Sequence, residues 1–324
     1  MKTTNYCPSI SIVIVTWNGK KCALECLESL QHQLCDLQVE VIVVDNASTD
    51  GTPTAIRQQF PEVVLIENDC NLGFAKANNI GIAVAQGEYV CLVNSDVVVD
   101  PECLQRMTQY MSTHINIGML GPKMRAPDGG IGYSVMRLPT IWNTFCCAMG
   151  LHSVFPQVAR LSGYMATEFP YTNTEDVEVL TGWFWMVRRS ALNQVGGLDE
   201  RFFMYGEDID WCHRFHKAGW RVVFYSEAES LHYGAASSAG APVRFYIEMQ
   251  RANLQYFRKH HGPVAGLAFL VINWLHQLIR VSGYAALYCI KGNRRSEAAF
   301  KLMRSWSCLK WLASDKVSPL QTNA

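Results

Sequence analysis

The chain has 324 residues, of which 49% are hydrophobic and 17% are charged. This length predicts one large domain with an appendage, or two domains, and the composition excludes a disordered or fibrous chain. The 28 basic residues equal the 28 acidic ones, which argues against a strongly basic protein that binds nucleic acid.

The overall charge balance hides a split along the chain. Residues 1–242 carry 16 basic and 25 acidic residues, whereas residues 243–324 carry 12 basic and 3 acidic ones. Such a split predicts a basic C-terminal segment that meets an anionic surface.

Cysteine usage and the N-terminus both indicate a location in the cytoplasm. The 12 cysteines are scattered, with no CxxC pair and no paired Cys/His spacing typical of a zinc site, and we interpret them as reduced thiols. The apolar run at residues 10–15 is too short for the apolar region of a signal peptide.

Short apolar runs alternate with helical patterns through the first part of the chain. Helices are predicted at residues 74–86 and after Pro101, and strands at residues 9–16, 39–44, 63–66, 89–93 and 117–120. This alternation predicts an α/β fold with a mostly parallel sheet. Because ligands of such sheets bind beyond the carboxyl ends of the strands, the turns after these strands are candidate site positions.

The alternation stops between residues 125 and 180, where no clear period is visible. We interpret this stretch as an insertion or as a segment that faces a substrate. Regular patterns return with a strand at residues 181–187, a helix at residues 207–218 and a strand at residues 221–225. Gly219 follows the helix and predicts its C-terminal cap.

The end of the chain is predicted to be helical, after a Gly/Ala/Ser-rich linker at residues 234–242. Residues 262–290 are almost continuously apolar, and one narrow polar stripe interrupts them, formed by Asn273, His276, Gln277 and Arg280. A central arginine weakens a membrane-spanning interpretation. Because basic residues and tryptophans follow, we expect the segment to lie at a membrane surface. A helix buried in a homodimer or against the main domain is the alternative.

Two polar turns follow predicted strands. Residues 45–51 come after the second strand, and Asn94, Ser95 and Asp96 leave a buried strand directly. Asn94 and Asp96 are two residues apart in an extended chain, so both can face one hard cation or its phosphate ligands. An ordinary polar turn is the alternative in both places.

Three acidic residues, Glu207, Asp208 and Asp210, fall in the first turn of a predicted helix. Acids at a helix N-terminus complement the helix dipole, which accounts for one or two of them. The preceding loop contains an aromatic residue and Gly206, and this position suits a general base that reaches an acceptor hydroxyl.

Several motifs occur in a fixed order, at residues 11–18, 43–51, 71–81, 92–96, 196–203 and 206–210 and at His232. Each is weak alone. Together, over about residues 9–240, they resemble family 2 glycosyltransferases of the GT-A fold, in particular the bacterial rhamnosyltransferase-like branch. The resemblance implies a GT-A fold, a Rossmann-like and mostly parallel sheet, here with a C-terminal helical extension.

The resemblance also implies roles for individual residues. Asp45 matches the carboxylate that accepts a hydrogen bond from the donor's nucleobase, with Thr16 and Asn18 on the neighbouring turn. Asp96 matches the metal-binding acid of the DXD motif, and His232 matches a late metal ligand found in part of the family.

Asp208 matches the catalytic base of the family. The remaining donor-binding positions that the motifs imply are Asn71, Gly73, Asn78, Asn94 and Ser95. The family often has Asp where this chain has Asn94, so metal binding rests more heavily on Asp96 and His232. The implied cofactor is Mg²⁺ or Mn²⁺.

Acceptor contacts are expected at Trp183 and Glu207. Trp183 and Trp185 alternate along a predicted strand and are able to stack on a sugar, although packing in the core is the alternative. The histidines at positions 260 and 261 have no acid near them in sequence, and we expect them at the surface.

The sequence therefore predicts a metal-dependent, inverting glycosyltransferase, with a GT-A domain at residues 1–240 and a basic, membrane-associating helical segment at residues 241–324. It is expected to act at the inner face of the cell membrane, in cell-surface polysaccharide synthesis. The predicted reaction moves a sugar, rhamnose as the first candidate, from a nucleotide-diphosphate donor to a glycan or polyprenyl-linked glycan.

Two alternatives remain open at this level. One is a hexosyl, galactofuranosyl or N-acetylhexosaminyl transferase with the same machinery, and the other is a catalytically silent scaffold that binds nucleotide sugars. A dinucleotide oxidoreductase is disfavoured because Thr16 to Gly19, after the first strand, contain no GxGxxG fingerprint.

Overall fold

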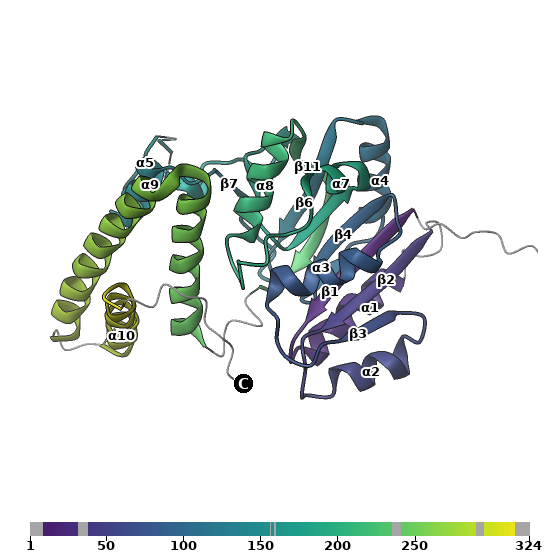
Figure 1. The fold of residues 1–324 in the computed structure, drawn as a ribbon, viewed down its shortest axis with the longest axis horizontal. Helices are drawn as coiled ribbons and strands as arrows, with labels where there is room; N and C mark the ends of the chain where they lie inside the picture. Colours follow the sequence, from purple (N-terminus) through teal and green to yellow (C-terminus); the bar gives the residue numbers. More distant parts are fainter. Residues whose placement is uncertain are drawn as a thin grey trace, which may run out of the picture.

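The computed structural model describes residues 9–31, 38–155, 157–158, 160–234, 241–289 and 295–314. Within these residues the core is one nine-stranded sheet in the order β3-β2-β1-β4-β10-β6-β11-β5, with β8 paired to β11. Helices lie on both faces of this sheet, and a group of long helices extends to one side of it (Figure 1).

Half of the sheet consists of parallel strands from the first part of the chain. They are β1 (Ile10–Thr16), β2 (Val39–Asp45), β3 (Val64–Glu67) and β4 (Tyr89–Asn94). Their register places Thr16 beside Asp45 and Val15 beside Asn94. The polar residues at the ends of these strands therefore lie along one edge of the sheet, as the sequence predicts.

The other half of the sheet mixes strand directions. β10 (Phe184–Arg188) runs antiparallel between β4 and β6 (Ile117–Arg125), and β11 (Arg221–His232) lies parallel to β6. β5 (Val97–Val99) follows β4 and pairs antiparallel with the end of β11, where Val97 lies opposite His232. The prediction of a mostly parallel sheet is confirmed.

Helices cover both faces because successive apolar residues of each parallel strand point to opposite sides. One face carries α1 (Lys20–Gln31), α2 (Thr52–Gln59) and α4 (Cys103–Thr113). The other face carries α3 (Phe74–Val84), α7 (Arg189–Val195) and α8 (Glu207–Lys217). Burial on both sides explains why the parallel strands are continuous apolar runs in the sequence.

Residues 125–180, for which the sequence predicts no regular structure, contain only short elements. They are β7 (Val135–Met136), α5 (Ile141–Ala148), α6 (Leu151–Val154), η1 (Gly163–Met165), β8 (Glu175–Asp176) and β9 (Val179–Leu180). Elements this short do not show a periodic pattern. β7 pairs with β9, and the Thr181 N–H donates to the Ser134 carbonyl oxygen (3.0 Å), so the segment returns to the sheet just before β10.

Three predicted strand boundaries are wrong, and one of them is the end of the strand predicted at residues 117–120, which continues to Arg125. The strand predicted from Thr181 begins at Phe184, because the Trp183 N–H bonds back to the Thr181 carbonyl oxygen (2.9 Å) in a turn. The strand predicted to end at Tyr225 continues to His232, with an irregularity after Tyr225. The predicted cap at Gly219 is confirmed by its left-handed φ of 83°.

The described residues after 240 fold into helices, as predicted, whereas residues 235–240 of the predicted linker lie outside the described residues. α9 (Pro242–Cys289) is interrupted at Gly262, whose φ is 82°. It therefore has a first arm, residues 242–261, and a second arm, residues 263–289. Figure 1 shows these arms as an inverted V, with α10 (Arg295–Leu312) packed against α9.

The polar stripe of the second arm points into the protein. The Gln277 amide donates to the Tyr246 hydroxyl (2.8 Å) and to Asn273 Oδ1 (2.9 Å), and the Asn273 amide donates to Gln250 Oε1 (3.1 Å). Tyr246 and Gln250 belong to the first arm, so this network holds the two arms together. His276 Nδ1 donates to the Ala148 carbonyl oxygen at the end of α5 (2.6 Å).

Because the polar stripe faces inward, apolar side chains of the second arm face outward. The exposed ones recur every three or four residues and form what we call the apolar stripe of α9: Val264, Leu267, Val271, Leu275, Leu278 and Ile279. Among the described residues, α9 is the helix whose length and mean hydropathy, 1.5 in its most apolar window, would allow it to cross a membrane.

Gly73, in the loop between β3 and α3, gives a first test of the fold. Its φ is 83°, and a Cβ there would lie 2.4 Å from the Phe203 carbonyl oxygen. We expect Gly73→Ala to lower the melting temperature far more than Gly129→Ala, which has the same φ but open space around it and should cost about 1–2 kcal/mol from strain alone. Equal losses in thermal unfolding would show that the contact with Phe203 is not tight.

Candidate active site

Two buried acceptor atoms lie side by side where β1 and β2 end. Thr16 and Asp45 are register partners, and each is 1% exposed. Asp45 Oδ2 accepts a hydrogen bond from the Ser48 N–H (2.8 Å). Asp45 Oδ1 and Thr16 Oγ1 have no hydrogen-bond partner among the described residues. Since buried polar atoms are almost always bonded, this pair is suited to a ligand that donates hydrogen bonds.

Asn18 joins the loops that follow these two strands. Its N–H donates to Ser48 Oγ (2.8 Å), and its side-chain oxygen accepts from the Thr49 N–H (2.7 Å). The Lys20 N–H donates to Asp50 Oδ2 (3.0 Å) in the same way. Asn18 therefore fixes the geometry around Asp45.

The loop before α3 is held by a chain of amides. The Asn46 side chain donates to the Gly73 carbonyl oxygen (3.2 Å) and accepts from the Asn68 amide (2.8 Å). Asn71 Oδ1 accepts from the Gly73 N–H (3.0 Å). Asn46, which the sequence analysis left without a role of its own, thus connects the end of β2 to this loop.

Asn78 lies inside α3 and is 1% exposed, and its amide donates to the Phe74 carbonyl oxygen (2.9 Å). Among the expected donor-binding residues, Thr16, Asn18 and Asp45 are thus brought together directly. Asn78 contributes to the packing of the neighbouring helix instead.

Asp96 and His232 are brought together from opposite ends of the sequence. Asp96 directly precedes β5, and the β5–β11 register places His232 next to it, with 3.1 Å between His232 Nε2 and Asp96 Oδ1. The Tyr233 N–H donates to the Asp96 carbonyl oxygen (3.0 Å), which closes the pairing. The two expected metal ligands therefore lie in contact.

Trp183 lies beside this pair and is 3% exposed. Its ring stacks on the His232 ring, with 5.6 Å between centroids and 21° between planes. Its carbonyl oxygen accepts from the Asn94 N–H (2.9 Å), next to the partly exposed Ser95. Trp183 thus supports the imidazole, and its ring is covered in this structure and does not form an open sugar platform.

The donor atoms at Asp96 and His232 fit a divalent cation that also binds substrate phosphate. Among the described residues, no group of three or more His, Cys, Asp and Glu side chains surrounds a common point. One carboxylate and one imidazole leave most coordination positions to other oxygens, which is typical of Mg²⁺ and Mn²⁺ bound together with phosphates.

Asp208 lies at the start of α8, after Gly206 with its left-handed φ of 80°. Its carboxylate accepts hydrogen bonds from the backbone N–H groups of Ile209 (2.8 Å) and Gly182. Burial raises the pKa of this carboxyl, although the backbone donors oppose the shift. Gly182 is followed by Trp183, so one short segment contacts both Asp208 and the Asp96–His232 pair.

Glu207 is 6% exposed, and its Oε2 has no partner among the described residues. Burial, and then the charge of Asp208, raise the pKa of Glu207 well above its ordinary value. The expected acceptor contact at Glu207 is therefore covered in this structure.

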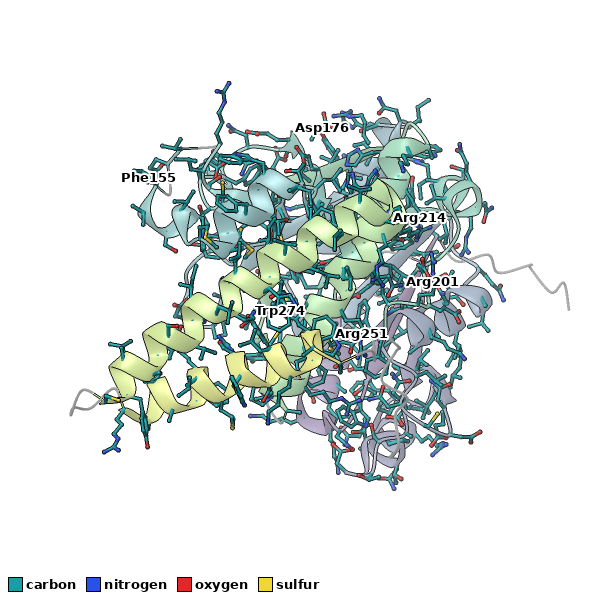
Figure 2. The ribbon with its side chains drawn as sticks, turned by 60° about the vertical axis from the view of Figure 1, so that its left-hand side comes forward. Phe155, Asp176, Arg201, Arg214, Arg251 and Trp274 are labelled. Carbon is teal, nitrogen blue, oxygen red and sulfur yellow. The ribbon has the colours of Figure 1, made fainter. Side chains whose placement is uncertain are left out.

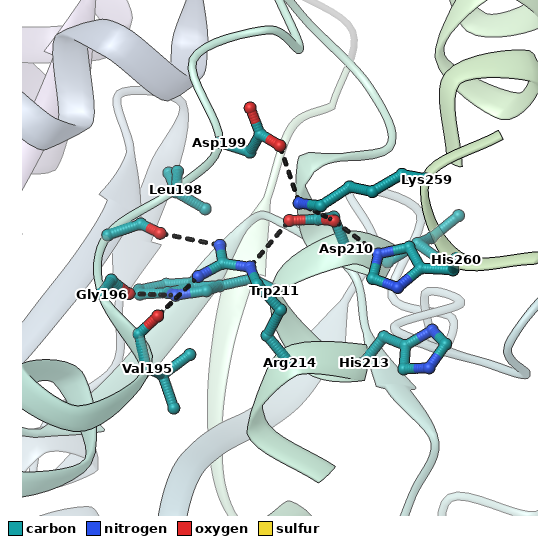
Figure 3. Close-up of polar contacts among 12 residues, drawn as sticks. Val195, Gly196, Leu198, Asp199, Asp210, Trp211, His213, Arg214, Lys259 and His260 are labelled. Carbon is teal, nitrogen blue, oxygen red and sulfur yellow. Dashed lines mark hydrogen bonds and ion pairs between the residues drawn. The ribbon is translucent and has the colours of Figure 1, made fainter. Parts of the chain in front are cut away.

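The third acid of this turn, Asp210, is fully buried and contacts basic side chains from two helices (Figure 3). Lys259 Nζ lies 2.5 Å and His260 Nε2 lies 2.7 Å from Asp210 Oδ1, and Arg214 Nε lies 2.8 Å from Asp210 Oδ2. The expectation that His260 lies at the surface is wrong, because the helical fold supplies the acid that its sequence neighbours lack.

The same group of residues fixes the loop before α8. Arg214 also donates to the carbonyl oxygens of Val195 (2.9 Å) and Gly197 (2.7 Å), and Lys259 donates to Asp199 Oδ2 (2.7 Å). We call Asp199, Asp210, Arg214, Lys259 and His260 the Asp210 cluster. Burial alone would raise the pKa of Asp210, but the hydrogen bonds from His260 and Lys259 outweigh it and lower the pKa.

Comparison with known proteins shows the class of enzyme. Residues 11–196 match the sequence profile of glycosyl transferase family 2. The chain belongs to this family and is a glycosyltransferase.

Two relatives are similar to this chain over about 70% of its length. An N-acetylglucosaminyl-diphospho-decaprenol L-rhamnosyltransferase of Mycobacterium tuberculosis (strain H37Rv) is 34% identical over 239 residues, which cover 69% of this chain and 76% of that protein. An O-antigen biosynthesis protein of Myxococcus xanthus is 26% identical over 234 residues, 71% of this chain and 18% of that protein.

Solved structures confirm the fold. A mannosyltransferase from Pyrobaculum calidifontis, solved in complex with GDP-Man and Mn²⁺, superposes with a TM-score of 0.53 and 19% identity. The match covers 96% of this chain and 89% of that chain, and it supports the GT-A fold predicted from the sequence.

The Asp210 cluster predicts a large and pH-dependent loss of stability in Asp210→Asn. Breaking a buried ion pair on one side costs about 3–5 kcal/mol at neutral pH. The pKa of Asp210 is lowered in the folded protein. The ionised carboxylate therefore contributes fully to the free energy of unfolding above the ordinary pKa of an aspartate, and this contribution is lost as pH falls through the lowered pKa of the folded protein. Thermal unfolding of the wild type and of Asp210→Asn, carried down to pH 2, should therefore show two curves that stay apart above the ordinary aspartate pKa of 3.8 and approach each other only below it.

Asp208→Asn is the matched control, since it changes an acid two residues away whose pKa burial raises. We expect this variant to keep its melting temperature at neutral pH. Similar losses in both variants would contradict a special role of the Asp210 cluster in stability.

Proposed function

We propose that this protein is a metal-dependent, inverting glycosyltransferase that moves a sugar, with rhamnose as the first candidate, from a nucleotide diphosphate to a lipid-linked glycan at the inner face of the cell membrane. The observation that carries the proposal is the contact of one segment, Gly182 and Trp183, with both Asp208 and the Asp96–His232 pair. The printed name of the mycobacterial relative, a transferase to a decaprenol-linked sugar, supports the choice of sugar and acceptor.

The donor's nucleobase is proposed to bind where β1 and β2 end. Asp45 Oδ1 and Thr16 Oγ1 are the buried atoms without partners, and an imide N–H of a pyrimidine would bond to such a carboxylate. Asn18 holds the loop beside them. Thymine and uracil present the same imide, and guanine also presents a ring N–H, so this contact selects neither one base nor the sugar.

Asp96 and His232 are proposed to hold a divalent cation beside the donor's diphosphate. When bound, such a cation supplies positive charge that neutralises the leaving diphosphate. The chain positions the two ligands through the β5–β11 pairing and orients the imidazole through the Trp183 ring. Asn94, at the end of β4, offers a neutral amide where a second acid would add charge.

Asp208 is proposed as the general base. Its raised pKa makes this carboxylate a better proton acceptor than an ordinary aspartate. It takes the proton of the acceptor hydroxyl while the hydroxyl oxygen attacks the anomeric carbon. Attack from the face opposite the diphosphate inverts that carbon.

The C-terminal helices are proposed to bind a membrane. The described part of residues 241–314 contains nine basic and two acidic side chains. The apolar stripe of α9 is exposed, and so are Phe300, Met303 and Trp306 of α10. Exposed apolar side chains on a segment with net positive charge match an anionic bilayer.

Replacing the proposed base tests the chemical step. Asp208→Asn should lower kcat by about 10² to 10⁴-fold and leave donor affinity within a few-fold, because a base acts in the chemical step. Asp128→Asn, at an exposed acid in the loop after β6, is the control, and we expect it to keep most of its activity. Steady-state kinetics with calorimetric donor binding measures both, and near-normal turnover of Asp208→Asn would move the base elsewhere.

A hydrolysis screen of nucleotide sugars with Mg²⁺ and Mn²⁺ tests the donor and the metal together. We expect release of thymidine diphosphate from its rhamnose derivative, and loss of this release in excess EDTA. Asp96→Ala should weaken binding of the nucleoside diphosphate only when the cation is present. Full activity in EDTA would contradict the role of Asp96 and His232.

Sedimentation with lipid vesicles tests the membrane contact. The full chain should sediment with phosphatidylglycerol-rich vesicles and less so at high salt, since each basic residue near an anionic surface contributes about 1 kcal/mol. Leu278→Glu with Ile279→Glu should release it, whereas Ile115→Glu, at an exposed apolar residue of the sheet domain, should not. A dimer in light scattering without vesicle binding would favour the homodimer alternative.

A further inference from the structure

An open apolar groove lies between α5 and the second arm of α9. Ile141, Trp142 and Phe145 line one side, and Val264, Leu267 and Val271 line the other, around a volume of about 800 Å³. Figure 2 shows the second arm running between the segment that carries Phe155 and α10, with the groove on the side of that segment. This volume is in the range of ligand pockets.

Both walls of the groove are fixed by polar contacts outside it. Thr140 and Asn143 form a capping box at the start of α5, and the Trp142 indole N–H donates to the Arg160 carbonyl oxygen (3.0 Å). His276 of α9 donates to the carbonyl oxygen of Ala148, the last residue of α5 (2.6 Å). The walls of the groove are therefore held by contacts within the chain itself.

The lining is apolar and open to the outside. Val264 is 79%, Leu267 62% and Trp142 56% exposed, so a ligand that covers them removes apolar surface from water, at about 25 cal/mol per Å². Only an apolar ligand gains from this contact.

The groove continues directly into the apolar stripe of α9. From Gly262 to Ile279 the sequence contains no Asp, Glu, Lys or Arg, and Leu275, Leu278 and Ile279 extend the stripe beyond the groove. A hydrocarbon chain could thus pass from a bilayer at the stripe into the groove without leaving apolar surface.

The groove is also connected to the catalytic segment through the chain. α5 lies between β7 and β9, which pair with each other, and Thr181 bonds to Ser134 at the base of this pair (3.0 Å). The next residues, Gly182 and Trp183, are those that contact Asp208 and His232.

We infer that this groove binds the isoprenoid chain of the lipid-linked acceptor. The inference rests on the proposed function, since it names the part of the acceptor that the groove holds. A concave seat with two walls suits a single chain, whereas a flat bilayer surface meets the convex part of the stripe around Leu278. The segment that forms one wall of the groove leads through the β7–β9 pair to Gly182 and Trp183, so a chain bound here is held by the same segment that contacts the proposed site.

The test compares two acceptors with the same sugar diphosphate, one with a full polyprenyl chain and one with a chain of two isoprene units. Assays in mixed detergent micelles remove the need for vesicle binding. Leu267→Ser with Val271→Ser changes the groove, and Leu275→Ser with Leu278→Ser is the matched control at similarly exposed residues outside it. We expect the groove variant to lose about tenfold in kcat/KM, close to 1.4 kcal/mol, for the long acceptor only.

Photolabelling with a diazirine-bearing polyprenyl phosphate provides a readout that does not require transfer. We expect labelled peptides from residues 141–145 and 264–271 in the wild type, and loss of this label in the groove variant. Label in the groove without transfer would overturn the proposed acceptor but support the groove. Two results would overturn the groove and leave the proposed function standing. One is a groove variant that still transfers sugar and still prefers the long acceptor, and the other is an equal loss of activity in the groove variant and the control variant.

Discussion

The buried carboxylate of Asp210 is the interaction on which the arrangement of the two parts of the molecule depends. A fully buried charge is tolerated only when opposite charges and hydrogen bonds surround it, and two of its three side-chain partners, Lys259 and His260, come from α9. Arg214 of α8 contacts Oδ2, whereas Oδ1 contacts Lys259 and His260, so the full set of partners requires the first arm of α9 to pack on α8. Because Asp208 lies on the same turn of α8, the proposed base is positioned by the same packing.

The pKa values of Asp208 and Asp210, two acids on one helical turn, thus shift in opposite directions because their surroundings differ. Asp210 faces cations from α8 and α9, which lower its pKa, whereas Asp208 faces backbone N–H groups in a buried setting, and its pKa is raised. Acids at a helix N-terminus look equivalent in sequence. The division between a structural acid and a proposed catalytic one follows from the partners that the fold supplies.

The sequence could predict features that a local pattern determines, but not contacts between distant segments. Continuous Val and Ile runs such as residues 10–15 and 39–44 determine the parallel strands and the edge where Thr16 and Asp45 meet, because burial on both faces is a local pattern. The contact between Asp96 and His232 depends on the pairing of β5 with β11, which no spacing reveals, so only the family resemblance implied it. The cluster around Asp210 was missed for the same reason, and the short elements of residues 125–180 have no period to detect.

The second arm of α9 shows how a polar stripe can determine the position of an apolar one. Asn273 and Gln277 bond to the first arm, and the first arm is held on α8 by Lys259 and His260. Each step is a specific polar contact, so the direction in which the apolar stripe points is fixed relative to Asp208 and does not depend on a flexible linker. A bilayer bound at the stripe would therefore lie at a constant distance from the proposed base. For a lipid-linked acceptor this is a steric constraint, because the sugar to be glycosylated is carried at a set height above the membrane by its diphosphate.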